Sequence, residues 1–496
     1  MSEFAMLSLP EGMEKFGISE AVRTDLLIGG VWRGGSAGKR VEVFDPSTGK
    51  VLTSIADGTI EDGIAAVEAA AAAAKSWAAT APRQRGEILR KCWELMMSRA
   101  EMFAQLISLE NGKALPDARG EVAYAAEFFR WFSEEAVRIN GDFSIAPSGN
   151  NRIMVQYQPI GVSVLITPWN FPAAMATRKM APALAAGCTV VLKPATETPL
   201  TAFAMAALME EAGVPKGVVN VVTTSNSGPV VSAMLHHPEV RKLSFTGSTQ
   251  VGRVLLREAA DQVINCSMEL GGNAPFVVFD DADLNKALDG AMIAKMRNGG
   301  EACTAANRFY VQSGIAERFA SGLAQRMGAM KQGAGYGAGV AVGPLINQKA
   351  VDRIHGWVQD AVARGASVLT GGTAGGGDGY YYPPTVITKV PADSALVRDE
   401  IFGPVAPVTI FETLDEAVAL ANDSEYGLIA YVYTEDLRKG MQVADRFEAG
   451  MVGLNRGIVS DPAAPFGGVK QSGLGREGAH HGILEFCEAK YTAVSW

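Results

Sequence analysis

Apolar and polar positions alternate with two different periods along the middle of the chain. Short apolar runs typical of buried strands are separated by longer runs with the period of helices. The predicted strands cover residues 161–166, 189–193, 218–222 and 242–246, and the predicted helices between them cover 173–186, 200–212 and 228–235. A second alternating set begins at Ala274 and runs to about residue 460. This order predicts an α/β fold with two parallel-sheet domains, whose ligands bind at the carboxyl ends of strands.

The first 160 residues follow another pattern. Residues 26–55 read as short strands joined by turns. Residues 60–79 are Ala-rich and predict a helix, and amphipathic helices are predicted over 82–110 and 117–138. Residues 140–159 break this periodicity with turn residues followed by Arg-Ile-Met-Val-Gln-Tyr-Gln, which predicts an extended arm.

The composition is that of a globular enzyme. The chain has 496 residues, of which 48% are hydrophobic and 20% charged, enough for two or three domains. The formal net charge is −9 and no cluster of Lys and Arg stands out, which argues against a nucleic-acid partner. No apolar run approaches the ~18 residues of a membrane span.

The cysteines and histidines indicate neither disulfide bonds nor a metal site. Five cysteines without paired close spacing indicate neither a disulfide framework nor a zinc site. The histidine pairs at 236–237 and 480–481 have no neighbouring Cys or carboxylate spacing that supports a metal site. The first twenty residues are acidic and lack a long apolar core, unlike a targeting signal. We therefore expect a cytoplasmic protein with no bound metal and no membrane partner.

Two glycine-containing segments carry a candidate base and a candidate nucleophile. They read Ser-Met-Glu-Leu-Gly-Gly-Asn-Ala-Pro at 267–275 and Gly-Gly-Glu-Ala-Cys-Thr-Ala-Ala-Asn-Arg at 299–308. A cysteine attacks as the thiolate, and a carboxylate accepts a proton from water once partial burial raises its pKa. Cys303 and Glu269 are therefore the residues to form and hydrolyse a thioester. The same two segments are also compatible with a buried structural cysteine and with a strand that ends in a turn.

These segments, with several others, resemble the aldehyde dehydrogenase superfamily from about residue 25 to the C-terminus. The matching segments are Pro-Trp-Asn-Phe-Pro at 168–172, Lys-Pro-Ala at 193–195, Phe-Thr-Gly-Ser-Thr at 245–249, Met-Glu-Leu-Gly-Gly at 268–272, Glu-Ile-Phe-Gly-Pro at 400–404 and Pro-Phe-Gly-Gly-Val-Lys at 465–470. Within the superfamily the chain is most similar to succinate-semialdehyde dehydrogenases, through residues 171–179 and 241–248.

The resemblance implies a domain organisation and an assembly. We expect two Rossmann-type parallel-sheet domains and a small β oligomerisation arm. The expected boundaries are 1–139 with 160–270 for the dinucleotide-binding domain, 271–460 for the catalytic domain that carries the nucleophile, and 140–159 with 480–496 for oligomerisation or bridging. Arms of this kind pair with a neighbouring subunit in the superfamily, so the resemblance implies a homodimer or homotetramer.

The predicted oxyanion hole combines Asn170 with the backbone N–H of Cys303. Asn170 follows the predicted strand 162–166, where ligands of α/β sheets bind. Attack of Cys303 turns the aldehyde oxygen into an alkoxide, and a preorganised donor there contributes about 3 kcal/mol. Asn beside two prolines is more often a turn residue, so this role depends on the resemblance.

The expected cofactor is NADP, with NAD possible. The chain lacks the Gly-x-Gly-x-x-Gly fingerprint, and the segment from Phe245 to Gly252, which closes a strand and opens a helix, takes its place. Where many NAD-specific relatives carry a glutamate, this chain has Thr196. Its hydroxyl can donate to the 2′-phosphate of NADP, and Lys193 supplies a positive charge. The adjacent Glu197 means that NAD is still a possible cofactor. The predicted cofactor-binding residues are Thr167, Pro168, Trp169, Lys193, Thr196, Gly247, Ser248, Gly252, Leu270, Glu400 and Phe402.

The predicted substrate is succinic or a similar semialdehyde. Arg178 and Arg297 match the two arginines that hold a distal carboxylate in the resembled enzymes, and Ser460 and Phe466 complete the predicted substrate set. Asp461 lies beside or at the position of a serine in those enzymes, and a carboxylate pointing into the site would disfavour an acidic substrate. An uncharged aliphatic or aromatic aldehyde is therefore the alternative, and a CoA-acylating enzyme or a non-catalytic structural relative is a more distant one.

Overall fold

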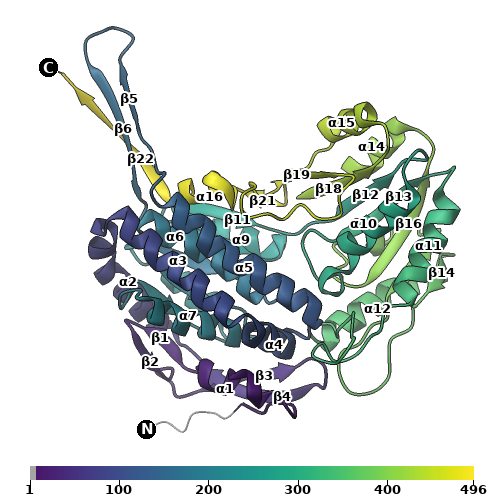
Figure 1. Cartoon of the computed structure of the whole chain (residues 1–496), viewed down its shortest axis with the longest axis horizontal. Helices are drawn as coiled ribbons and strands as arrows, with labels where there is room; N and C mark the ends of the chain where they lie inside the picture. Colours follow the sequence, from purple (N-terminus) through teal and green to yellow (C-terminus); the bar gives the residue numbers. More distant parts are fainter. Residues whose placement is uncertain (1–6, 496) are drawn as a thin grey trace.

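Two central β-sheets lie in separate lobes of the computed structural model, which describes residues 7–495 (Figure 1). Strands β7 to β11 of the first sheet run parallel, whereas short strands add antiparallel at both edges. The α/β class predicted from the alternation is thus confirmed. The spatial order of the first sheet is β2 (Val31–Arg33), β1 (Leu26–Ile28), β9 (Val219–Val221), β8 (Thr189–Lys193), β7 (Val162–Ile166), β10 (Val240–Thr246), β11 (Asn265–Glu269) and β21 (Gly473–Leu474).

The order of the parallel strands fixes where this sheet can bind a ligand. Along the chain, β7, β8 and β9 are added to one side, and β10 and β11 are then added on the other side of β7. Open α/β sheets bind ligands outside the carboxyl ends of the strands where this reversal occurs. Residues 167–170 follow β7 and residues 247–248 follow β10, so both segments lie at that point.

Helices bury both faces of the first sheet. Residues alternate in direction along each strand, so Leu165 joins the core with α6 and α7 while Val164 joins the core with α2 and α8. Helix α6 is buried along its whole length because α3 and α5 form a further layer over it (Figure 1). The helices of this lobe are α1 (Ile18–Ala21), α2 (Ile60–Ala79), α3 (Pro82–Ser98), α4 (Ala100–Asn111), α5 (Leu115–Glu135), α6 (Pro172–Ala186), α7 (Leu200–Ala212), α8 (Ser227–Leu235), α9 (Thr249–Ala260) and α16 (Ala479–Leu484).

The single helix predicted over residues 82–110 is wrong. The chain leaves helical geometry at Arg99, with φ −113° and ψ 21°, and α4 begins at Ala100. Helix α3 buries one face, whereas residues 102–111 of α4 are all buried. The change of direction at Arg99 is what lets α4 enter the interior, and neither Gly nor Pro marks it in the sequence.

The second sheet is also largely parallel, with one antiparallel edge strand, β14. Its order is β14 (Ser367–Thr370), β15 (Thr385–Thr388), β16 (Val405–Phe411), β13 (Ala306–Gln312), β12 (Ala274–Val278), β18 (Ile429–Tyr433) and β19 (Met451–Leu454). Its helices are α10 (Leu284–Met296), α11 (Ala316–Gly328), α12 (Gln348–Ala363), α13 (Ala395–Arg398), α14 (Leu414–Asn422) and α15 (Leu437–Arg446). The connection from β11 to β12, residues 270–273, carries the chain from one sheet to the other.

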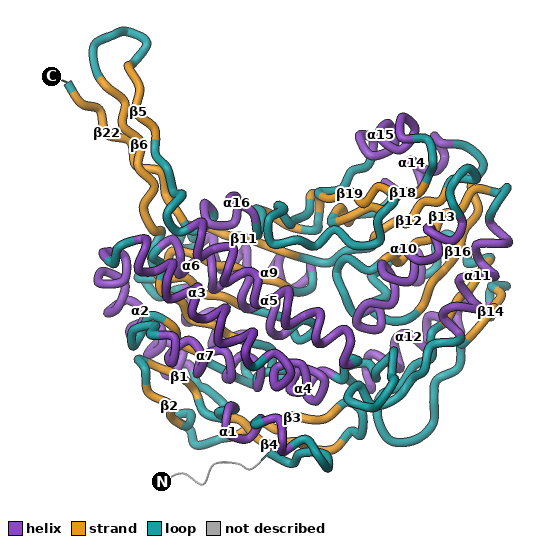
Figure 2. Tube along the Cα trace, viewed as in Figure 1, coloured by secondary structure: helices purple, strands orange, loops and turns teal. Residues whose placement is uncertain are grey.

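A three-stranded antiparallel arm projects from the first lobe and consists only of strands and loops (Figure 2). It contains β5 (Asp142–Ile145), β6 (Arg152–Pro159) and β22 (Cys487–Val494). Two smaller sheets pair β3 (Arg40–Asp45) with β4 (Lys50–Ala56) and β17 (Tyr426–Gly427) with β20 (Val469–Lys470).

The chain after residue 460 leaves the second lobe. It returns to the first lobe, where β21 pairs with β11 and α16 packs against α5 and α6, and β22 then joins the arm. Residues 1–6 and residue 496, which the sequence assigned to the dinucleotide-binding and bridging segments, lie outside the described residues.

Candidate active site

A cavity of about 360 Å³ opens between the two lobes. The carboxyl ends of β7, β10 and β11 form one side, and the loop that precedes the amino end of β13 brings Cys303 to the other. Nine predicted site residues line it: Pro168, Trp169, Asn170, Gly247, Ser248, Leu270, Cys303, Glu400 and Phe402. Seven further lining residues were not predicted: Thr246, Gly271, Ile346, Asn347, Lys349, Ala350 and Arg353.

Cys303 is held against the connection between the sheets. Gly272 allows this approach, because a Cβ on Gly272 would lie 2.2 Å from the carbonyl oxygen of Cys303. Desolvation raises the pKa of the Cys303 thiol to about 12, and the positive charge of Arg178 opposes that rise. Burial thus favours the thiol, and Cys303 must lose its proton before it attacks as the thiolate.

Asn170 is 3% exposed and directs its side-chain amide toward the nucleophile loop. Its Nδ2 donates a hydrogen bond to the carbonyl oxygen of Glu301, at 3.0 Å. An amide nitrogen carries two hydrogens, so this contact leaves one N–H for an oxygen atom bound beside Cys303.

Glu269 ends β11 and is 2% exposed. Neither of its carboxylate oxygens accepts a hydrogen bond from any residue that the structure describes. Burial raises the pKa of Glu269 well above its usual value, the negative charge of Glu477 adds to the rise, and Arg178 and Lys179 oppose it. A buried carboxylate without hydrogen-bond donors is a strong proton acceptor once it is ionised.

The two predicted substrate arginines differ in their surroundings. Arg178 is fully buried, forms an ion pair with Glu477, and has its guanidinium 4.1 Å from the ring centroid of Phe466. Arg297 is half-buried, and its guanidinium lies 4.8 Å from the ring centroid of Phe171. Within residues 7–495 no carboxylate forms a salt bridge with Arg297, although its positive charge acts on the Asp117 carboxyl.

Tyr124 was missed by the sequence reasoning. Burial raises the pKa of the Tyr124 hydroxyl, and the charges of Arg178 and Arg297 oppose that shift, so the hydroxyl lies near both guanidinium groups. Tyr124 lies on α5, where a tyrosine at helical spacing gave no signal beyond core packing.

Ser460 and Asp461 lie in the loop after β19. Ser460 is half-buried, and Asp461 is exposed. Asp461 Oδ1 accepts a hydrogen bond from the backbone N–H of Ala463, at 2.9 Å. The carboxylate thus stabilises a turn in its own loop.

Residues predicted to hold the nicotinamide half of a cofactor meet in the cavity. Glu400 Oε1 accepts a hydrogen bond from the N–H of Gly272 at 3.0 Å, and desolvation raises the pKa of Glu400 to about 7. The rings of Phe402 and Trp169 meet edge to face, with centroids 5.4 Å apart. Ser248 caps α9, because its hydroxyl accepts a hydrogen bond from the N–H of Val251 at 3.3 Å.

Four predicted cofactor residues do not line the cavity, namely Thr167, Lys193, Thr196 and Gly252. Lys193 is buried at the end of β8, where its Nζ donates to the Pro194 carbonyl at 3.3 Å. Thr196 is half-buried and donates to Glu197 at 3.3 Å. Gly252 packs α9 against Leu270, since a Cβ there would lie 2.4 Å from Leu270 Cδ2.

Two unpredicted cations, Lys349 and Arg353, stand one turn apart on α12 and line the cavity. Arg353 is also near Glu400, whose negative charge opposes the lowering of the Arg353 pKa by burial. The i, i+4 spacing of the two cations was visible in the sequence, but such pairs are usual on solvated helices.

Other classes of site find no support in the part of the chain that the structure describes. Residues 7–495 contain no helix long and apolar enough to cross a membrane. The same residues contain no group of three or more His, Cys, Asp or Glu placed to hold a metal ion.

The fold and the site define a class of protein: a doubly wound α/β lobe that carries an amide donor and a buried carboxylate and faces a cysteine across a cavity. The chain belongs to the aldehyde dehydrogenase family, whose pattern it matches over residues 32–492. It is 56% identical to the succinate-semialdehyde dehydrogenase of Paenarthrobacter nicotinovorans, over 90% of this chain and 99% of that protein.

Two further relatives come from Escherichia coli. The chain is 47% identical to an NADP(+)-dependent succinate-semialdehyde dehydrogenase of strain K12, over 97% of this chain and 99% of that protein. A crystal structure described as an E. coli NADP-dependent enzyme superposes with a TM-score of 0.95 at 47% identity, covering 96% of this chain and 99% of that one.

Proposed function

We propose that this chain is an NAD(P)-dependent aldehyde dehydrogenase that oxidises succinic or a similar semialdehyde to the carboxylate, with NADP the favoured cofactor. The observation that carries the proposal is the convergence of Cys303, Asn170 and the segment after Glu269 on one cavity at the point where the strand order reverses. Family membership and the names of the similar enzymes support the same activity.

Each of the three central residues has one role in the proposed reaction. The Cys303 thiolate adds to the aldehyde carbon, and the developing alkoxide accepts hydrogen bonds from Asn170 and from the Cys303 N–H. When bound, the nicotinamide supplies the acceptor for the hydride that leaves this carbon. The product on the protein is a thioester of Cys303, and Glu269 accepts a proton from the water that cleaves it.

The residues present fit a dinucleotide. Its diphosphate would lie by the N-terminus of α9, where Ser248 borders the cavity, with Lys349 and Arg353 opposite. Glu400 and Phe402 would hold the nicotinamide end. Lys193 and Thr196, outside the cavity but at the end of β8, would hold the adenine ribose and a 2′-phosphate.

A panel of aldehydes with both cofactors tests the function. Initial rates of cofactor reduction should be highest for succinic or glutaric semialdehyde, and lower for aliphatic aldehydes and benzaldehydes of similar size. Preference for an uncharged aldehyde would replace the semialdehyde with the alternative substrate class, and no reduction with any aldehyde would overturn the proposal.

Removing the charge of Arg297 should lower kcat/KM for acidic aldehydes much more than kcat/KM for neutral ones. Arg297→Ala should lower kcat/KM for succinic semialdehyde by roughly 10- to 100-fold, because a charge-assisted hydrogen bond contributes about 1.5–3 kcal/mol. A neutral aldehyde of similar length should lose far less, and equal losses on both would contradict the role. The Arg178→Ala variant is a harsher test because it also leaves Glu477 with Lys179 as its remaining ionic partner.

Replacing Asp461 tests the departure from the resembled enzymes. Asp461→Ser should improve turnover of succinic semialdehyde if the loop turns its carboxylate toward the substrate, because a negative charge near the site repels the distal carboxylate. In the structure this carboxylate caps its own loop. Unchanged kcat/KM would show that Asp461 stays in that turn during catalysis.

Thr196→Glu should shift the cofactor preference toward NAD. The new carboxylate would face the 2′-phosphate, and like charges brought together in a partly desolvated site cost several kcal/mol. The ratio of kcat/KM for NADP to that for NAD measures the shift. A wild-type enzyme that already prefers NAD, with an unchanged variant, would show that residue 196 does not face the ribose.

The domain assignment, the assembly and the location remain part of this proposal. The lobes built on the first and second sheets serve as dinucleotide-binding and catalytic domains. The projecting arm, with Phe143 and Ile145 exposed, supports a homodimer or homotetramer. The described cysteines are all unpaired, which supports a reducing, cytoplasmic location.

A further inference from the structure

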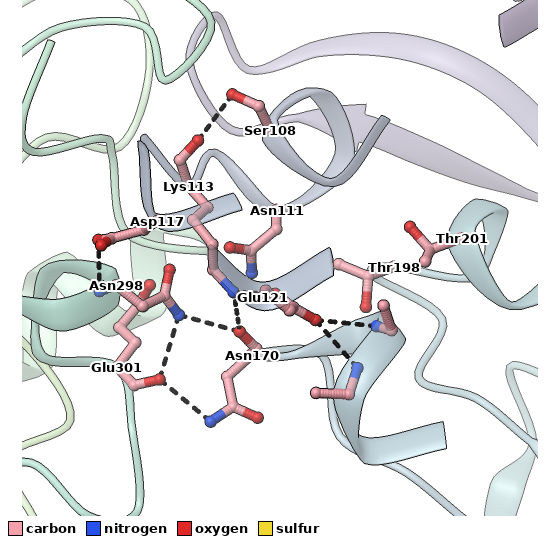
Figure 3. Close-up of polar contacts among 12 residues, drawn as sticks. Ser108, Asn111, Lys113, Asp117, Glu121, Asn170, Thr198, Thr201, Asn298 and Glu301 are labelled. Atoms are coloured by element: carbon pink, nitrogen blue, oxygen red, sulfur yellow. Dashed lines mark hydrogen bonds and ion pairs between the residues drawn. The ribbon is translucent and has the colours of Figure 1, made fainter. Parts of the chain in front are cut away.

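The turn that carries Asn170 has its carbonyl groups held by side chains from distant parts of the chain. The carbonyl oxygen of Trp169 accepts hydrogen bonds from Asn111 Nδ2 and Thr198 Oγ1, both at 3.2 Å. The carbonyl oxygen of Asn170 accepts bonds from Lys113 Nζ at 2.8 Å and Asn298 Nδ2 at 3.0 Å (Figure 3). Residues 167–171 belong to no helix or strand, so these donors replace the bonds that regular structure would supply.

Lys113 is fixed from several directions. It is 2% exposed, its Nζ forms an ion pair with Glu121, and the same nitrogen lies 3.8 Å from the ring centroid of Phe171. The other carboxylate oxygen of Glu121 accepts hydrogen bonds from the N–H groups of Ala173 and Ala174, at 2.9 and 3.2 Å. One buried ion pair therefore holds both the Asn170 carbonyl and the start of the helix that follows it.

Asn298 reaches the same carbonyl from the nucleophile loop, five positions before Cys303. Its backbone has φ +52°, and its N–H donates to Asp117 Oδ2 at 2.8 Å. Its side-chain Nδ2 donates to the Asn170 carbonyl and also to the Glu301 carbonyl, at 3.2 Å. Since Asn170 Nδ2 donates to that same Glu301 carbonyl, the three residues form a closed set of hydrogen bonds between the lobes (Figure 3).

We propose that Lys113 and Asn298 are positioning residues that hold the Asn170 amide in the orientation needed to donate to the substrate oxygen. This inference rests on the proposed function. A donor contributes to catalysis only if its direction is set before charge develops, and a displacement of about 1 Å can cost about 10²-fold in rate. With the Asn170 carbonyl held by two donors and one amide hydrogen held by Glu301, the direction of the remaining hydrogen is set.

The first test removes the ion pair as a unit. The double variant Lys113→Met with Glu121→Gln leaves no buried charge unpaired, and the amide introduced at position 121 retains an oxygen for the helix N–H groups. We expect kcat to fall by about 10- to 100-fold with little change in KM or in the cofactor Kd. Alkylation of Cys303 by iodoacetamide should keep its rate, because alkylation creates no oxyanion.

A double-mutant cycle with Asn170→Ala separates positioning from general damage. In the Asn170→Ala background, loss of the Lys113 pair should lower kcat by less than twofold, because the group it positions is already absent. Asn298→Gly, which keeps the positive φ without strain and removes the donor, should behave in the same way. Independent, multiplicative losses of kcat in the two backgrounds would overturn the proposal.

A second lysine–glutamate pair, with a buried lysine and a half-buried glutamate, provides the control. Lys242 Nζ lies 3.3 Å from Glu485 in the same lobe and does not contact Asn170. Lys242→Met with Glu485→Gln should lower Tm while kcat stays within about twofold. If the control loses as much kcat as the Lys113 variant, the effect is structural and the inference fails. If the Lys113 pair cannot be replaced in a folded protein, the Asn298→Gly cycle decides alone. Wild-type turnover of the aldehyde panel tests the proposed function separately.

Discussion

Replacing Cys303 by alanine should abolish aldehyde oxidation and leave cofactor binding intact. The thiolate forms the bond on which every later step depends, so its removal should lower kcat by about 10⁴-fold or more. Cys303 borders the cavity but is not among the residues proposed to hold the dinucleotide, so Kd for NADP from protein fluorescence should change little.

Cys487→Ala is the matched control, since Cys487 is an unpaired cysteine on β22. It should retain wild-type kcat, which shows that loss of a cysteine is not harmful in itself. Substantial turnover by the Cys303→Ala enzyme would end the thioester assignment.

Glu269→Gln should stop the reaction after its first half. The amide cannot accept a proton from water, so thioester hydrolysis should slow by roughly 10²- to 10⁴-fold. The earlier hydride transfer needs no base for water, and a rapid-mixing experiment should show one equivalent of reduced cofactor per active site and then little turnover.

The pH profile follows from the sign of the Glu269 shift. Its pKa lies well above the usual value because of burial, and only the ionised carboxylate accepts a proton. The wild-type rate of deacylation should therefore rise with pH through that raised pKa. This limb should vanish in Glu269→Gln, and an unchanged steady-state rate in the variant would identify another group as the base.

The three central residues of the candidate site could be predicted from the sequence because the signals that mark them are local. Cys303, Glu269 and Asn170 each lie in a short segment with its own glycines or prolines, and the alternation of strand and helix places those segments at sheet ends. Lys113 and Asn298 have no such signal, because they meet Asn170 across 57 and 128 positions of the chain. Burial of a lysine of this kind depends on its partner carboxylate, which single-sequence periodicity does not reveal.

The same distinction holds for the fold. The parallel strands were predictable from their apolar runs, whereas the break between α3 and α4 occupies the single residue Arg99, without Gly or Pro. The return of β21 to the edge of the first sheet beside β11 is a pairing between residues about 200 positions apart. The local pattern of apolar and polar residues predicts which segments form strands. Which distant strands pair with each other depends on the packing of the complete chain.

The arm has a consequence for the order of events during synthesis. Strand β22 pairs with β6 from Cys487 opposite Pro159 to Val494 opposite Arg152, so residues 487–494 complete a sheet begun more than 300 residues earlier. Domains generally fold as units while the N-terminal part emerges from the ribosome, but this sheet must wait until the C-terminal strand has left it. Any assembly that uses the arm therefore has to wait for residues 487–494, and a nascent chain stalled before residue 487 should contain both lobes and remain unable to join a partner through the arm.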